Sequence, residues 1–283
     1  MIIDSHAHYC HKLYTGEFSY LDWDGEAFFL ARGNRQQLLS VMQEKGIALC
    51  IEPGTSLEKA ADQLAMQAEF APYFQVALGV HPKKCSLTPW EDREKLRQLV
   101  LNHSIVAIGE TGLDYSVPPE ELDKQCQKKW FAYQIALADE RQLPLILHIR
   151  EADRDGLEIL QQNKQLLHGG VAHCFGGDYE TAMSYVDLGF ALGIGGRLLQ
   201  NDSLALQETV KKVPLSAILL ETDAPYIRPD ISTLPYSGKQ RKKARNSSLI
   251  LPAVLERIAQ LRGEPRQVVE EAIHQNTLRV FKL

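Results

Sequence analysis

Short apolar runs alternate with longer amphipathic segments along most of this chain. The apolar runs are continuous rather than alternating, which is typical of strands buried on both faces. The longer segments carry apolar residues at helical spacing, as Trp130, Tyr133 and Leu137 do. The pattern predicts eight strands, at residues 1–3, 47–51, 76–80, 105–109, 144–147, 170–172, 190–194 and 217–220.

Helices are predicted between these strands and in the amphipathic tail from Asn246. Thr55 or Ser56 is the expected N-cap of one of them. The polar and aromatic residues 9–33 have no clear period and are expected to form an extended loop. Eight strand-then-helix units predict a (β/α)8 TIM barrel, an α/β fold with residues 1–283 as a single domain. The clearest predicted helices are 34–45, 55–70, 90–101 and 119–141.

Polar residues follow directly on the first apolar run, in the order Asp4-Ser5-His6-Ala7-His8. Residues two apart in an extended chain point to the same side, so His6 and His8 could hold one metal ion. Two exposed turn histidines would give the same short pattern. The residues at the other strand ends decide between a metal site and two exposed histidines.

The ends of later predicted strands carry His81, Glu110, His148, His173 and Asp223. In a (β/α)8 barrel these ends converge on one face, so the side chains become neighbours. A single buried histidine is more often a hydrogen-bonded core residue, and a single terminal glutamate is more often solvated. The whole set favours a metal centre, because buried charge without a cation is costly.

These ligands are more than one tetrahedral ion uses, so we expect two divalent ions with Glu110 as their bridge. Two ions about 3.5–4 Å apart activate a water and stabilise both the attacking and the leaving oxygen. Asp223 is expected to bind metal and to take the proton from the water. Glu221 either shares this face or is a salt-bridged carboxylate lower in the barrel. The set predicts a hydrolase.

Composition narrows the class of protein. A hydrophobic content of 45% and a charged content of 24% are typical of a globular chain rather than a disordered one. No apolar run reaches the about 20 residues of a membrane span, and Asp4 and His6 interrupt the N-terminus where a signal peptide is apolar, so we expect a cytoplasmic protein. The five cysteines form no Cys-x-x-Cys pair, and their odd number favours reduced thiols. A net charge of -5 gives no overall attraction for nucleic acid, so such binding needs a local patch.

Six motifs cover essentially the whole chain. They are Asp4-Ser5-His6-Ala7-His8, Gly79-Val80-His81-Pro82, Gly109-Glu110-Thr111-Gly112-Leu113-Asp114-Tyr115, Leu147-His148-Ile149-Arg150-Glu151-Ala152, His173-Cys174-Phe175-Gly176-Gly177 and Leu220-Glu221-Thr222-Asp223-Ala224-Pro225-Tyr226. In residues and order they resemble the TatD family of metal-dependent hydrolases and deoxyribonucleases, within the amidohydrolase-like barrels.

The resemblance implies a metal-dependent deoxyribonuclease, often exonucleolytic, with Mg, Mn or Zn as its two ions. It implies DNA as the substrate and places His81 near the substrate phosphate. The sequence leaves the oligomeric state open, and a monomer is favoured. The metal ligands that the resemblance implies are His6, His8, Glu110, His148, His173 and Asp223.

Three parts depart from the family pattern. Asn246 is followed by Ser247 and Ser248, whereas the family often has Asn-Glu-Pro. The Ser/Thr-Phe-Ser-Gly type of pattern is altered at residues 193–197, and residues 9–33 are longer than is common. These departures leave the metal set intact and are expected to lie where a substrate binds.

Residues 239–245 concentrate five positive charges in the predicted loop after the eighth strand, and Lys83-Lys84 follow His81. They form either a groove that follows phosphates or an ordinary solvated loop. In the first case an aromatic ring could stack on a base. The candidate rings are Tyr115, Phe175 and Tyr226.

The metal set therefore predicts a two-metal hydrolase without a covalent intermediate, and the resemblance implies that it cleaves phosphodiester bonds in DNA. A second hypothesis is hydrolysis of a small ester, an amide or an aminoacyl ester on RNA, since the same activated water attacks a carbonyl. Many amidohydrolases bridge their metals with a carboxylated lysine, and no lysine ends a predicted strand, which favours the phosphodiesterase. A third hypothesis is a non-catalytic, metal-stabilised binding barrel.

Overall fold

The computed structural model describes residues 1–118 and 122–283. The chain forms two compact units, each made of separate stretches of sequence. The first contains Met1–Glu52, Cys174–Tyr179 and Gly193–Thr277, and the second contains Pro53–His173, Glu180–Leu192 and Leu278–Leu283.

Three parallel strands organise the first unit. β1 (Ile2–Asp4) pairs with β4 (Ile47–Glu52), and the chain after β1 hydrogen-bonds to β10 (Ile218–Leu220), where the Ser5 amide donates to the Leu220 carbonyl at 2.9 Å. Nearly every residue of these strands is buried. Continuous apolar strands of this kind are what a parallel sheet requires.

A β-hairpin replaces the extended loop predicted for residues 9–33. β2 (Phe18–Trp23) and β3 (Phe28–Gly33) are antiparallel, and Asp24 stabilises the turn because its side chain accepts hydrogen bonds from the Glu26 and Ala27 amides. The prediction was wrong because it overlooked the Asp24-Gly25 turn between two β-prone runs, a typical hairpin sequence.

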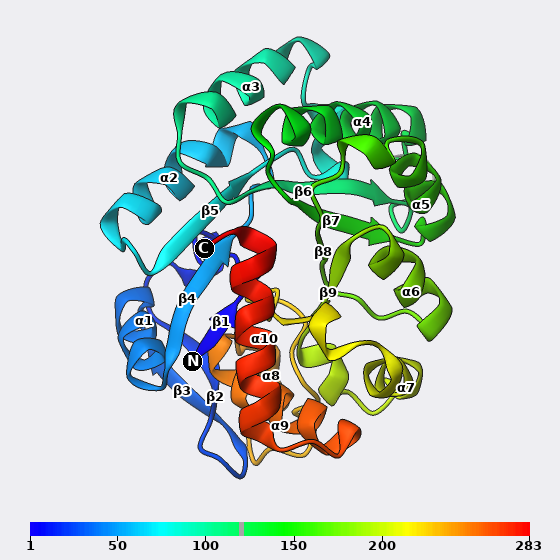
Figure 1. The fold of residues 1–283 in the computed structure, drawn as a ribbon. Coiled ribbons are helices and arrows are strands. Elements are labelled where there is room, and N and C mark those ends of the chain that lie inside the picture. Colours follow the sequence, from blue (N-terminus) through cyan, green and yellow to red (C-terminus); the bar gives the residue numbers. More distant parts are fainter. Residues whose placement is uncertain (119–121) are drawn as a thin grey trace. The chain divides into compact units, whose positions relative to one another are not determined.

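The helices of the first unit begin with α1 (Arg35–Glu44), where Asn34 and Gln37 form a capping box. A short helix, α8 (Gly238–Lys243), occupies part of the basic segment that was predicted as a loop. Its start is also fixed by a capping box, between Ser237 and Gln240. The other helices, drawn in Figure 1, are α7 (Leu204–Lys212), α9 (Leu251–Arg262) and most of α10 (Arg266–Phe281).

The second unit is built on five parallel strands that follow one another in chain order. Helices lie between them in the sequence, and α4 packs on β6, where the buried Gln134 donates to Thr111. The strands are β5 (Phe74–Leu78), β6 (Ala107–Asp114), β7 (Leu145–Arg150), β8 (Gly170–Ala172) and the first residues of β9 (Phe190–Ile194). The helices are α2 (Ala60–Glu69), α3 (Arg93–Asn102), α4 (Lys124–Arg141), α5 (Asp153–Gln162) and α6 (Tyr179–Asp187).

Several boundaries differ from the prediction. α2 begins at Ala60 after a 3-10 turn, and Ser56 makes no side-chain cap hydrogen bond. Asp123 caps α4 at Lys124, whereas its predicted start, Pro119, lies outside the described residues. Glu110 and His148 lie inside β6 and β7 rather than at their ends, because the ladder continues through the polar residues that follow each apolar run.

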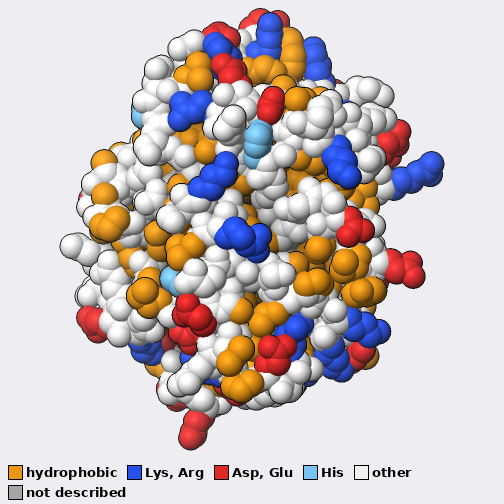
Figure 2. Space-filling view, in the orientation of Figure 1, with side chains coloured by type: hydrophobic (Ala, Val, Ile, Leu, Met, Phe, Trp, Pro, Cys, Tyr) orange, Lys and Arg blue, Asp and Glu red, His pale blue; other side chains and the backbone are white. Residues whose placement is uncertain are grey.

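The predicted (β/α)8 barrel class is confirmed. In both units the strand order follows the sequence, all eight strands are parallel and helices separate most of them, which is the connectivity of this fold. Among the described residues, no helix is both long and apolar enough to cross a membrane. On the face shown in Figure 2, acidic and basic side chains are interspersed, in keeping with the small net charge.

Gln134 gives a test of how α4 is held to its strands. This buried side chain accepts from the Val80 amide at 2.7 Å and donates to Thr111 Oγ1 at 2.8 Å. We expect Gln134→Ala to lower the free energy of unfolding by about 2 kcal/mol, since the buried backbone amide of Val80 loses its hydrogen-bond acceptor. Gln125→Ala, at an exposed position on the same helix, is the control and should change little. Equal urea midpoints for the two variants would contradict this role.

Candidate metal centre

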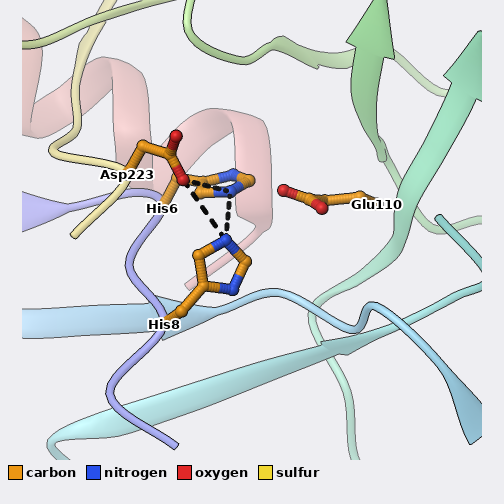
Figure 3. Close-up of side chains that lie close together, drawn as sticks. All are labelled: His6, His8, Glu110 and Asp223. Carbon is orange, nitrogen blue, oxygen red and sulfur yellow. Dashed lines mark hydrogen bonds and ion pairs between the residues drawn. The ribbon is translucent and has the colours of Figure 1, made fainter. Parts of the chain in front are cut away.

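His6, His8 and Asp223 bring three potential metal ligands together in the first unit. His6 and His8 follow β1, after a bend at Ser5 and His6, and Asp223 follows β10. The two Nε2 atoms are 3.3 Å apart, and Asp223 Oδ1 lies 3.3 Å from His8 Nε2 and 3.8 Å from His6 Nε2. Figure 3 shows the three groups pointing toward one another. Glu110, also drawn there, belongs to the second unit and is described with it.

The spacing of these three atoms suits a small divalent cation. Ligand atoms about 2.0–2.2 Å from a common tetrahedral ion are separated from one another by about 3.3–3.6 Å. Two imidazole nitrogens and one carboxylate oxygen are also a donor set that binds Zn and Mn. His6, His8 and Asp223 could therefore hold one ion.

A buried carboxylate fixes the two stretches that carry these ligands. Asp4, fully buried, accepts hydrogen bonds from Thr222 Oγ1 and Ser248 Oγ, both at 2.6 Å, and from the His6 amide at 3.2 Å. The Asp223 amide donates to the His6 carbonyl at 2.9 Å. Burial raises the pKa of Asp4 to about 6, against the opposing effect of its hydrogen bonds from Ser248 and Thr222.

The serines that replace the family's Glu-Pro have structural contacts. Ser247 and Ser248 are fully buried. Ser247 Oγ donates to the Leu21 carbonyl at 2.6 Å, and Ser248 donates to Asp4 and contacts the Tyr9 hydroxyl at 2.8 Å. The expectation that this departure lies against a substrate is therefore wrong, because these side chains face the interior.

His81, Glu110, His148 and His173 form a second group of potential ligands, within the second unit. His148 Nδ1 lies 2.9 Å from His173 Nε2 and 3.2 Å from His81 Nε2. Glu110 places one oxygen 3.6 Å from His173 Nε2 and the other 3.5 Å from His81 Nε2. His81, Glu110 and His148 could together hold a metal ion. Each of these four predicted residues thus contacts two of the others.

Asp114 orients this group, a role that was not predicted from the sequence. Its Oδ2 lies 2.9 Å from His148 Nε2 and 3.1 Å from Lys83 Nζ. Burial alone would raise the pKa of Asp114, but hydrogen bonds from His148, Ser116 and Lys83 outweigh it and lower that pKa. A carboxylate on one imidazole nitrogen fixes the tautomer and leaves the other nitrogen for a metal.

The period of β6 was the signal that could have identified Asp114. Gly112 and Asp114 are two residues apart, beyond the register shift at Glu110, and so share one face of the strand. Gly112 pairs with His148 across the ladder, and a Cβ at Gly112 would overlap the His148 carbonyl. The chain therefore passes close enough to His148 for the next residue on that face, Asp114, to reach its ring.

Glu221 lies within 4.8 Å of His6, measured between potential ligand atoms, which favours the first of the two alternatives considered from the sequence, that it shares the face of the metal ligands. Its carboxylate accepts a hydrogen bond from the Cys174 amide, and the side chain is buried. A Cβ at Gly193 would overlap this carboxylate, and one at Gly195 would overlap the Glu221 carbonyl. The altered pattern at residues 193–197 thus includes glycines that make room for Glu221.

Comparison with known proteins identifies the family. The family model described as TatD related DNase matches residues 3–282. A protein of Rahnella sp. named 3'-5' ssDNA/RNA exonuclease TatD is 31% identical over 252 residues, covering 88% of this chain and 93% of that protein. YcfH of Escherichia coli K12, named an uncharacterized metal-dependent hydrolase, is 36% identical over 205 residues, 72% of each chain.

Solved structures agree in fold. YJJV, a TatD homologue from Escherichia coli K12, is 26% identical with a TM-score of 0.83, covering 100% of this chain and 98% of its own. A TatD-family hydrolase from Entamoeba histolytica has a TM-score of 0.80 at 22% identity, over 99% and 97% of the two chains. From its first strand to its last helix, this chain belongs to the TatD-related DNase family.

Proposed function

We propose that the protein is a divalent-metal-dependent nuclease that hydrolyses phosphodiester bonds from the end of a nucleic acid strand. The observation that carries this proposal is the spacing of His6, His8 and Asp223, whose donor atoms lie 3.3–3.8 Å apart, close to the about 3.3–3.6 Å between ligands of one tetrahedral ion. The family and the name of the Rahnella relative, a ssDNA/RNA exonuclease, support nucleic acid as the substrate.

The proposed centre takes two ions. His6, His8 and Asp223 would hold the first, and Glu110, His148 and His173 would hold the second. The bound ions, Mg, Mn or Zn, supply charge stabilisation at the scissile phosphate and activate the attacking water.

The remaining steps fall to the protein's own side chains. Asp223 accepts the proton of the attacking water, since its carboxylate lies 3.3 Å from His8 and would reach a water held among the same ligands. His81 donates a hydrogen bond to a phosphate oxygen of the substrate. Asp114 is a positioning residue that holds the His148 ring through Nε2, 2.9 Å away.

Removal of Asp223 tests the nuclease. We expect Asp223→Asn to lower the rate of DNA shortening by about 1,000-fold or more, since both a ligand and the proton acceptor are lost. The assay uses metal-stripped protein reloaded with Mg, Mn or Zn, and end-labelled single-stranded and double-stranded DNA. Asp202→Asn, an exposed site on a turn, is the matched control.

The possible failures have different meanings. If metal binds but no DNA is cleaved with any of the three ions, the nuclease proposal is wrong, and a small ester, an amide or an aminoacyl-RNA ester becomes the substrate to assay. If metal only raises the melting temperature and none of these substrates turns over, the protein is a metal-stabilised binding barrel.

Replacement of Asp114 tests how the second group is oriented. Asp114→Asn keeps the side-chain volume but removes the negative charge beside the His148 ring. We therefore expect metal affinity to fall by about 10–100-fold. Isothermal titration of the metal-stripped protein measures this without any substrate. Ser116→Ala is the control, because Ser116 contacts only the other oxygen of Asp114. Equal metal affinities in the two variants would show that Asp114 does not orient the metal ligands.

A further inference from the structure

The basic segment contains both structural and accessible charges. Arg241 donates to the Leu234 carbonyl at 2.9 Å and to the Tyr236 carbonyl, so it holds the chain before α8 in place. Lys242 and Lys243, by contrast, are exposed. The choice between a phosphate-binding surface and a solvated loop is therefore made separately for each charged residue of this segment.

An open hollow of about 810 Å³ lies within the first unit, beside α8 and the chain that follows β10. Its volume is within the range of small-molecule sites, about 300–1,000 Å³. Lys242 lines this hollow and its neighbour Lys243 does not. The charged side chains around it are Arg228, Asp230, Arg241, Lys242 and Arg245.

Positive charge dominates the lining. Arg228 and Arg245 donate to backbone carbonyls, of Ala244 and Lys243 respectively, which carry no net charge to neutralise a guanidinium. Burial and the nearby charge of Arg245 lower the pKa of Arg228, as expected where cations are crowded. Asp230 is the single carboxylate among the described lining residues. The hollow is therefore suited to an anion.

Of the three rings considered for base stacking, Tyr226 is the accessible one. Phe175 is buried, and the Tyr115 ring is covered by Lys124 Nζ at 4.2 Å. Tyr226 is 45% exposed and lines the hollow.

Tyr226 also stands next to the ligands of the first ion. Its amide donates to the Asp223 carbonyl at 2.8 Å, and its ring centre lies 6.2 Å from that of His8. Its hydroxyl lies 3.1 Å from His11 Nε2, which helps to fix the ring. One aromatic side chain thus joins the candidate metal ligands to the basic hollow.

We propose that this hollow binds a nucleotide of a single-stranded nucleic acid beside the nucleotide that is cleaved. Tyr226 stacks on its base, and Lys242 and Arg245 bind its phosphate. An unstacked base is required, so a single strand is preferred to a duplex. The assignment of a neighbouring cleaved nucleotide rests on the proposed nuclease function, whereas binding in the hollow does not.

Two adjacent lysines provide the test. The probe is a short fluorescent oligothymidylate, and its affinity for metal-stripped protein is measured by anisotropy at several salt concentrations. We expect Lys242→Gln to weaken binding and to reduce the slope of log K against log salt by about 0.7, the contribution of one phosphate contact on a single strand. Lys243→Gln, with the same change of charge outside the hollow, should have a much smaller effect on both.

The ring is tested in parallel. Tyr226→Leu should weaken binding of the oligothymidylate by at least about 5-fold, whereas Tyr226→Phe should bind nearly as the unaltered protein does. Circular dichroism and melting temperature show whether each variant is folded. A duplex probe should bind less tightly than the single strand.

Failure of this inference is distinguishable from failure of the nuclease proposal. If Lys242→Gln and Lys243→Gln weaken binding equally, or if no oligothymidylate binds, the hollow is not a nucleotide site, even where DNA is cleaved. If the reloaded protein cleaves no DNA but binding still depends on Lys242 and Tyr226, the hollow is a nucleotide site and the nuclease proposal is wrong.

Discussion

The buried carboxylate of Asp4 is the interaction on which the first unit depends. It accepts hydrogen bonds from residues that follow three different strands or helices in the sequence, through the His6 amide, Thr222 Oγ1 and Ser248 Oγ. Such a group is costly to bury unless every oxygen is satisfied. The same contacts therefore stabilise the fold and place His6 and Asp223 at a distance that suits one cation.

The sequence was most informative where apolar runs are buried on both faces. The runs at 170–172 and 190–194 coincide with β8 and β9, and the strand order and barrel class followed from the alternation of strands and helices. It was less informative where polar residues continue a strand, as at Glu110 and His148, because a ladder depends on pairing rather than on apolar character. The hairpin was missed for a related reason, since its residues face both protein and solvent.

The candidate site was predicted as a set of residue types, but not as a set of contacts. Each group brings its expected residues together, because strand ends converge whatever lies between them in the sequence. The supporting residues were harder to find. Asp114, Ser248 and Glu221 act through hydrogen bonds to particular neighbours, and only the three-dimensional arrangement identifies those neighbours.

The β2–β3 hairpin has a consequence for the basic hollow. The Leu21 amide donates to the Arg245 carbonyl at 2.9 Å, and the Arg245 amide donates to the Ser19 carbonyl at 2.8 Å, so the backbone that ends the basic segment is held like a short extra strand. A nucleic acid strand that enters the hollow would therefore contact backbone that is already ordered. The conformational entropy of this segment is therefore lost when the protein folds, whereas a mobile loop would lose it when the ligand binds.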